Sequence, residues 1–350
     1  MLPAAAMLIV GLLAGLARIG ILFIENPALR EVHAPAMIFG FVSSLISLER
    51  AVAIRRFWAF SSPLFLSVGS ALLIFSATQA VGKISILMGL GVMLLIYRRI
   101  WLRQQSIATS VQILANFVGF VSALLWLSGI SFEKVSMLAS LFLVLTIVGE
   151  RIELGRVGGL TLNGERLGLA LSTFTAVASI TPLLWGSLGY IVLGFSILTL
   201  VIWLFVVDVA RTTIGATGAT RYMAVCLLSG YVWLFVAGAT WIMVGEPKGK
   251  IFDLTTHAVL LGFVMSMIMA HASVILPAVL RIKLPYRKLF YVPLALLQVS
   301  LVARVVGDVR DEELLTQIGG AGNVLAIVTF LIAAATSAIL ATREVKAGNY

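Results

Sequence analysis

The stretch THAVLLGFVMSMIMAHASVILPAVLR, residues 256–281, is apolar enough to cross a lipid bilayer as a helix. It also contains two of the three histidines of the chain, His257 and His271. At about 1.5 Å per residue these imidazoles lie roughly 21 Å apart along the helix, and both leave it on nearly the same side. One metal ion cannot bind both, so any metal or haem held by either histidine takes its other ligand from another helix.

The composition of the chain is that of a membrane protein. Of its 350 residues, 61% are apolar and only 11% are charged, whereas charged residues make up about 25% of a soluble domain. In a bilayer the backbone polar groups must be satisfied within helices or a closed barrel. The apolar runs are too long for a barrel and lack its period-two alternation. We therefore expect an all-α, polytopic transmembrane helical bundle. The single cysteine, Cys226, excludes an internal disulfide.

Apolar runs and charged breaks divide a single integral membrane domain, residues 1–350, into twelve predicted spans. They are approximately 4–24, 34–54, 62–80, 84–100, 107–129, 135–151, 166–185, 188–208, 221–243, 254–280, 289–306 and 321–341. With both termini in the cytoplasm, most of the 25 Lys and Arg residues fall in inner loops or at inner ends. The net charge of +10 therefore predicts a multi-pass protein of a bacterial-type inner membrane, N-in and C-in. Its partner is the lipid bilayer, and no nucleic acid is expected.

Two features lie in the charged stretches between the predicted spans. A Glu-Arg pair closes a span twice, at Glu49-Arg50 and at Glu150-Arg151. This hints at an internal repeat of four spans, although shared loop chemistry explains two short matches equally well. The acidic stretch GDVRDEELLTQIGG, residues 307–320, is predicted to be an outer surface loop. No carboxylate chain for proton uptake is visible inside the predicted spans.

Four ionisable side chains are predicted to lie at a similar depth towards the outer face: His33, His257, Arg304 and Arg18. A charged side chain inside a span costs roughly 2.5–3.5 kcal/mol on insertion scales, so each of them is a functional candidate. The first hypothesis is that His33 and His257 are the two axial ligands of one haem. Arg304 and Arg18 would then bind the haem carboxylates, because a guanidinium matches a carboxylate with two hydrogen bonds.

Each of these residues also has a structural explanation. His33 would cap a helix, His257 would follow two threonines at a helix start, and the arginines would extend to the lipid headgroups. His271 is either a metal ligand, as an alternative to His257 or part of a second and incomplete site, or a buried neutral histidine that donates to a backbone carbonyl. The GxxxG formed by Gly11 and Gly15 is explained by close helix packing.

The layout resembles a known family. Twelve spans with His33 on the second and His257 on the tenth resemble subunit I of the haem-copper oxidases and the nitric oxide reductases. The segment THAVLLGF, residues 256–263, is similar to sequences of the NnrS family of haem-containing membrane proteins. The resemblance implies a haem b held by His33 and His257 near the outer side. It also implies that Arg304 binds a propionate, and it places Arg18 where the oxidases keep an arginine on their first span.

Two departures limit what this resemblance implies. Spans six and seven contain no histidine, so a copper-containing dinuclear centre cannot be built and no catalytic residue is predicted. His257 and His271 are fourteen residues apart, whereas the oxidase pattern places two histidines two apart on opposite faces.

The predicted function is a haem protein of electron transfer, with a redox partner protein, or of nitric oxide binding or response, with a small gas ligand. If the chain is an enzyme, it is a membrane oxidoreductase subunit. The alternative is a secondary transporter of a small anionic solute, in which Arg18 and Arg304 bind the substrate and the histidines couple protons.

Overall fold

The computed structural model describes residues 2–280 and 282–346, and every regular element in these ranges is a helix. Ten helices are long and apolar enough to cross a membrane, and two shorter apolar helices, Leu2–Arg18 and Phe57–Leu72, accompany them. Each of the twelve predicted segments overlaps one of these helices. The prediction of an all-α bundle with the apolar helices of a multi-pass membrane protein is confirmed.

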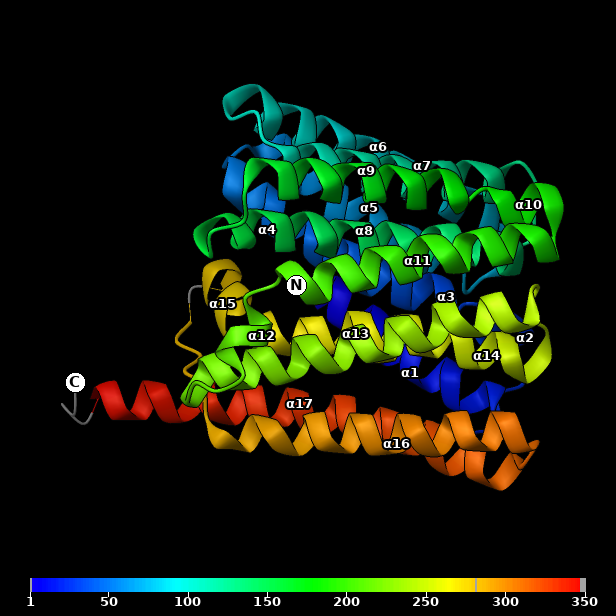
Figure 1. The fold of residues 1–350 in the computed structure, drawn as a ribbon. Coiled ribbons are helices and arrows are strands. Elements are labelled where there is room, and N and C mark those ends of the chain that lie inside the picture. The colour runs from blue at the N-terminus through cyan, green and yellow to red at the C-terminus, as the bar shows by residue number, and fades with distance from the viewer. Residues whose placement is uncertain (1, 281, 347–350) are drawn as a thin grey trace. The chain divides into compact units, whose positions relative to one another are not determined.

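The chain divides into two compact units, Met1–Leu200 with Trp241–Glu246, and Val201–Thr240 with Pro247–Tyr350. The helices from α1 to α10 belong to the first unit, and α11 begins in the first unit and ends in the second. These helices are α1 (Leu2–Arg18), α2 (Pro27–Glu31), α3 (His33–Pro35), the π-helix η1 (Ala36–Ser43), α4 (Ser44–Ile54), η2 (Phe57–Phe60), α5 (Ser61–Leu72), η3 (Ser76–Thr78), α6 (Gln79–Arg103), α7 (Ile107–Leu127), α8 (Phe132–Val157), α9 (Leu162–Ala178), α10 (Thr181–Trp185) and α11 (Ser187–Val207) (Figure 1). The remaining helices are α12 (Ala210–Thr213), α13 (Gly218–Val244), α14 (Gly249–His257), the π-helix η4 (Ala258–Met265), α15 (Ser266–Leu280), η5 (Lys288–Phe290), α16 (Tyr291–Arg310) and α17 (Glu313–Lys346).

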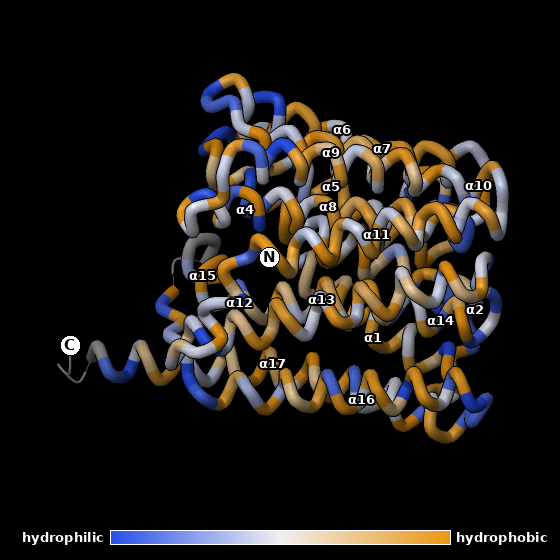
Figure 2. Tube along the Cα trace, in the orientation of Figure 1, coloured by the Kyte–Doolittle hydropathy of each residue, from blue (hydrophilic) through white to orange (hydrophobic). Residues whose placement is uncertain are grey.

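The first unit has α8 at its core. The sequence of α8 is apolar on all sides over most of its length, which is typical of a helix that other helices surround. In its apolar window 94% of the residues are buried, and within the unit α7, α9 and η1 pack against it. Figure 2 shows the general pattern, with apolar residues along the helices and hydrophilic residues gathered at their ends and connections.

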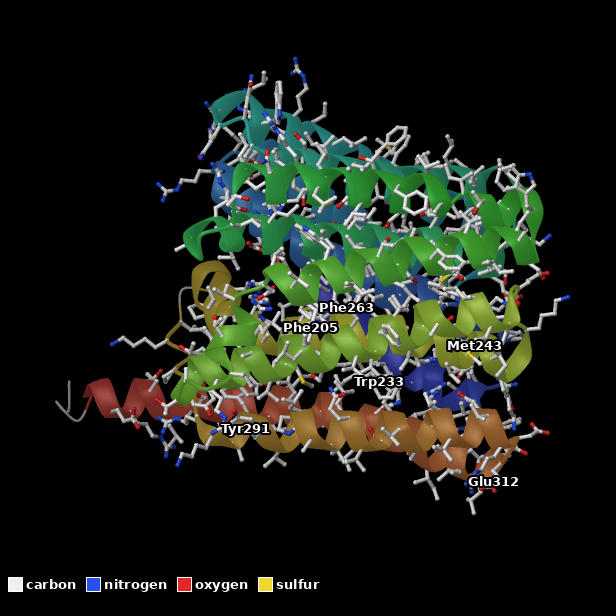
Figure 3. The ribbon with its side chains drawn as sticks, in the orientation of Figure 1. Phe205, Trp233, Met243, Phe263, Tyr291 and Glu312 are labelled. Atoms are coloured by element: carbon white, nitrogen blue, oxygen red, sulfur yellow. The ribbon has the colours of Figure 1, made fainter. Side chains whose placement is uncertain are left out.

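The second unit contains a long antiparallel hairpin of α16 and α17, which lie side by side (Figure 1). Tyr291 marks one end of α16, and Glu312 marks the turn at the other end (Figure 3). Asp311 closes α16 in the left-handed conformation, with φ 59°, which aspartate tolerates better than most residues. The hairpin packs closely because a Cβ atom at Gly319 would collide with the backbone of Arg304.

The helices extend beyond three of the predicted span boundaries near this turn. The helix of the tenth span begins at Gly249, that of the eleventh continues to Arg310, and that of the twelfth begins at Glu313. The stretch 307–320 is therefore not a surface loop, since only residues 311 and 312 separate α16 from α17. The predicted tenth and eleventh spans stop next to Asp253 and Asp308, whereas the helices continue because these two side chains have partners in the fold.

The Glu-Arg pair that occurs twice in the sequence meets in three dimensions in the first unit. The Arg50 guanidinium on α4 donates from Nη2 to Glu150 Oε1 on α8 at 2.7 Å, and its own neighbour Glu49 lies 3.8 Å away. The hydroxyl of Tyr97 on α6 is buried beside this group. The sequence similarity thus marks a tertiary ion pair between two helix ends.

The close approach of α16 and α17 predicts the effect of a single methyl group. Gly319→Ala is expected to lower the free energy of unfolding by about 1–3 kcal/mol, because the added carbon forces two packed backbones apart. Gly91→Ala on α6 is the matched control, since its new Cβ atom would meet only a Phe120 ring carbon at 3.6 Å. That variant is expected to be neutral or slightly stabilising. Thermal unfolding in detergent checks both, and equal midpoints would contradict the predicted difference.

Candidate functional site

His33 is held by a tertiary contact in the first unit. Its Nδ1 lies 2.7 Å from the carbonyl oxygen of Gly11 on α1, and a Cβ atom at Gly15 would lie 2.8 Å from its Cε1. The GxxxG on α1 therefore does more than pack helices, because one glycine supplies a carbonyl and the other supplies room for the imidazole. The alternative of a helix-capping His33 is wrong, since its ring bonds to α1 and the residue before α3 is Val32.

His257 lies at the end of α14, in the second unit. Its Nδ1 is 2.8 Å from the backbone oxygen of Asp253, one helical turn earlier, and 3.3 Å from Asp253 Oδ1. The alternative that placed His257 at a helix start is wrong, because α14 begins eight residues earlier, at Gly249. For both histidines the hydrogen bond to a carbonyl requires that Nδ1 carry the proton, which puts the lone pair on Nε2.

Both histidines are followed by a π-helical segment. The segment η1 spans Ala36–Ser43 and begins three residues after His33, and η4 spans Ala258–Met265 and begins directly after His257. Each contains the triplet Gly-Phe-Val. Eight-residue π segments are unusual, and π-helical turns inside α-helices are frequent at functional sites. The two units therefore place a histidine at the same kind of junction, a feature that hydrophobic periodicity does not reveal.

Arg304 and Asp253 form the strongest ion pair near His257. Arg304 on α16 donates from Nε to Asp253 Oδ2 at 2.7 Å and from Nη2 to Asp253 Oδ1 at 3.0 Å. The arginine side chain is only 8% exposed. This two-point contact is the geometry for which a guanidinium is best suited. Within the second unit, the structure thus links His257, Asp253 and Arg304 in a row.

Asp308 adds a second carboxyl group to this row. It lies one turn beyond Arg304 on α16, and its Oδ1 accepts a hydrogen bond from the Thr316 hydroxyl on α17 at 3.1 Å. Asp308 is 4% exposed, and its Oδ2 is buried without a hydrogen-bond donor. Its carboxyl group lies within hydrogen-bonding reach of the Asp253 carboxyl group. Two acidic groups are therefore in contact beside one guanidinium.

The remaining candidates lie elsewhere. His271 on α15 is buried, and its Nδ1 lies 2.8 Å from the carbonyl oxygen of Met267. Arg18 is the last residue of α1 and is exposed. His33 and Arg18 belong to the first unit, whereas His257, His271 and Arg304 belong to the second. Among the described residues, no group of three or more His, Cys, Asp or Glu side chains is arranged to hold a metal ion.

Comparison with known families identifies the group to which this sequence belongs. A family model described as a domain of unknown function, DUF8744, matches residues 1–339. The chain belongs to the DUF8744 family. The comparisons with curated proteins and with solved structures gave no match. The DUF8744 model covers both histidine junctions and the whole Arg304 row, so these features lie within the family domain.

The sequence interpretation missed Asp253 and Asp308 because both fell just outside the predicted spans. The structure places them inside the helices Gly249–Pro277 and Lys288–Arg310. A signal was present in their spacing, since Asp253 and His257, like Arg304 and Asp308, are four residues apart and therefore share a helix face.

The ion pair predicts a large difference between two neighbouring arginines. Arg304→Ala leaves the Asp253 carboxylate without its two donors and is expected to cost about 1–3 kcal/mol of stability. Arg310→Ala, at the exposed end of the same helix, is expected to change stability by less than about 0.5 kcal/mol. Thermal unfolding in detergent measures both effects. A tolerated Arg304→Ala would show that the pair does not hold α14 against α16.

Proposed function

We propose that this DUF8744 protein is a b-type haem-binding integral membrane protein with twelve spans and both termini in the cytoplasm. In this proposal it resides in a bacterial-type inner membrane, arranged as in subunit I of the haem-copper oxidases, and acts in electron transfer or nitric oxide binding and response. His33 and His257 are its axial ligands. The observation that carries the proposal is that each of these histidines bonds through Nδ1 to a backbone carbonyl and is followed by a π-helical segment, a combination that His271 does not share.

That hydrogen bond is what a haem ligand needs. Metal-bound histidines almost always donate their other ring N–H to a carbonyl or carboxylate, which fixes the ring and makes Nε2 the coordinating atom. Neutral imidazoles are common axial ligands of haem iron, and a bound haem supplies one-electron chemistry or a site for a diatomic gas. The single cysteine of the chain, Cys226, cannot form the two-cysteine attachment of a c-type haem, which supports haem b.

The arginines take different parts in this proposal. Arg304 holds Asp253, whose backbone oxygen accepts from His257, so Arg304 acts first as a positioning residue for that ligand. Its predicted contact with a haem propionate remains part of the proposal and uses the guanidinium nitrogen that Asp253 does not occupy. Arg18, exposed at the end of α1, is proposed as the second propionate partner.

The transporter alternative receives less support. Arg304 would be a principal anion-binding group of a transporter, yet only one of its guanidinium nitrogens lies outside the contact with Asp253. Transporter sites are typically built on interrupted helices, whereas the span Gly249–Pro277 is helical throughout. These observations favour the haem proposal.

The decisive measurement is the absorption spectrum of the detergent-purified protein. A Soret band with the features of a six-coordinate, low-spin haem is expected, and His33→Ala and His257→Ala are each expected to abolish that state. His271→Ala is the matched control, because this residue lies on the same span as His257, and its spectrum is expected to be unchanged. If His271→Ala instead of His257→Ala removes the signal, His271 is the ligand. A colourless protein that binds a small anion, with binding lost in Arg304→Ala, would favour the transporter over the haem protein.

The two glycines of α1 allow a finer test. Gly15→Ala places a carbon against the His33 ring and is expected to weaken haem binding by about 10–100-fold, as loss of ligand orientation typically does. Gly11→Ala meets mainly the flexible side chain of Met37 and keeps the carbonyl that His33 uses, so it is expected to bind haem normally. Haem titration of the two purified variants gives the comparison. Equal affinities would mean that the contact of Gly15 with His33 does not orient an iron ligand.

A further inference from the structure

A polar seam runs between α16 and α17 in the second unit. Ser300, Arg304 and Asp308 are spaced four residues apart and occupy one face of α16. Across the seam, Asp308 accepts from Thr316, and the Ser300 hydroxyl donates to Asn323 Oδ1 at 2.6 Å. This seam lies between two apolar helices, where each polar group needs a partner.

The seam lacks one donor. Arg304 gives two of its N–H groups to Asp253, and Thr316 has a single hydroxyl hydrogen, which it gives to Asp308 Oδ1. Asp308 Oδ2 is buried with no donor, although the Asp253 carboxyl group is within reach. Two ionised carboxylates in contact repel each other, and one guanidinium neutralises only one of them. A proton between the carboxyl groups removes the repulsion and supplies the missing hydrogen bond.

We propose that Asp308 is a proton-binding site, which carries an exchangeable proton on Oδ2 at neutral pH and donates it to the Asp253 carboxylate. The bound proton comes from water and returns to water, so the step is a simple acid dissociation. The site shares Asp253 with the contact of His257, but its proton lies on Asp308, and its test requires no bound haem.

The charged neighbours of Asp308 on every packed helix support this assignment. On its own helix, Arg304 is committed to Asp253, and on α17 Thr316 faces it and Glu313 adds negative charge near the turn. On α14, the Lys250 ammonium is bound by Asp311 Oδ1 at 2.7 Å. No remaining cation within the described part of the second unit is paired with Asp308.

The site lies close to the exposed turn between α16 and α17. Asp311 lies three residues beyond Asp308 on the α16–α17 turn, and its side chain is 87% exposed. The hydrogen bond from Lys250 holds the pKa of the Asp311 carboxyl group below its usual range, so Asp311 is ionised at neutral pH. Asp308 therefore lies within one helical turn of the exposed end of α16, which is the side from which we expect its proton to exchange.

Infrared spectroscopy of the full-length protein in detergent tests the proposal. The wild type at neutral pH is expected to show the C=O stretching band of a protonated carboxylic acid, which shifts in D₂O and disappears as the pH is raised. Asp308→Asn is expected to remove this band, whereas Asp311→Asn is expected to retain it. No exchangeable band in the wild type, or a band that survives in Asp308→Asn, would overturn the proposal.

The stability of the variants gives an independent readout. Asparagine has nearly the shape of a protonated aspartic acid, and its amide can donate to Asp253, so Asp308→Asn is expected to keep the wild-type melting midpoint at neutral pH. Asp253→Asn, which removes the charge bound by Arg304, is expected to lower it clearly. A large loss of midpoint in Asp308→Asn would show that the ionised carboxylate is required, and the proton site would be rejected.

Discussion

The arrangement of the second unit depends on one guanidinium beside two carboxyl groups. Arg304 binds Asp253 through two nitrogens, and an unpaired charge in a membrane span would cost several kcal/mol. This constraint fixes the register of α14 against α16. Because Asp253 also accepts from His257 through its backbone, the same pair determines where that imidazole lies, and it leaves Asp308 as the group without a donor.

Close backbone packing makes this arrangement possible. Gly319 lets α17 approach the backbone of Arg304, and Gly307 lets α16 approach Thr316. With larger residues at these positions, Thr316 would move away from Asp308 and the seam would lose its interhelical hydrogen bond. The glycines near the turn therefore keep Thr316 within hydrogen-bonding distance of Asp308, since a hydrogen bond weakens beyond its normal length.

The sequence was sufficient to predict the helical bundle, but not which charged residues pair with one another between helices. Runs of apolar residues predicted a segment for each apolar helix, because burial of backbone polar groups leaves a membrane chain few other structures. The same reasoning ended spans at Asp253 and Asp308, since a charge considered alone is costly in lipid. The partner of each charged residue lies on another helix, and the residue spacing along the chain does not give the distance between the two partners. In the same way, the sequence shows only that Arg50 follows Glu49, whereas the fold brings it to Glu150 at 2.7 Å.

The local geometry of the histidines favours one of the functions that the residue spacing alone leaves open. All three histidines bond through Nδ1 to a carbonyl, but only His33 and His257 also precede a π-helical segment, whereas His271 lies inside α15. The residue spacing from each histidine to the Gly-Phe-Val triplet differs between the two units, so a simple sequence duplication does not explain the similarity. A shared requirement on the imidazole does explain it, because a π segment changes the register of the residues that follow while the ring stays anchored at the junction. The proposed coordination of one haem iron would impose such a requirement, because it needs a neutral imidazole with its lone pair on Nε2.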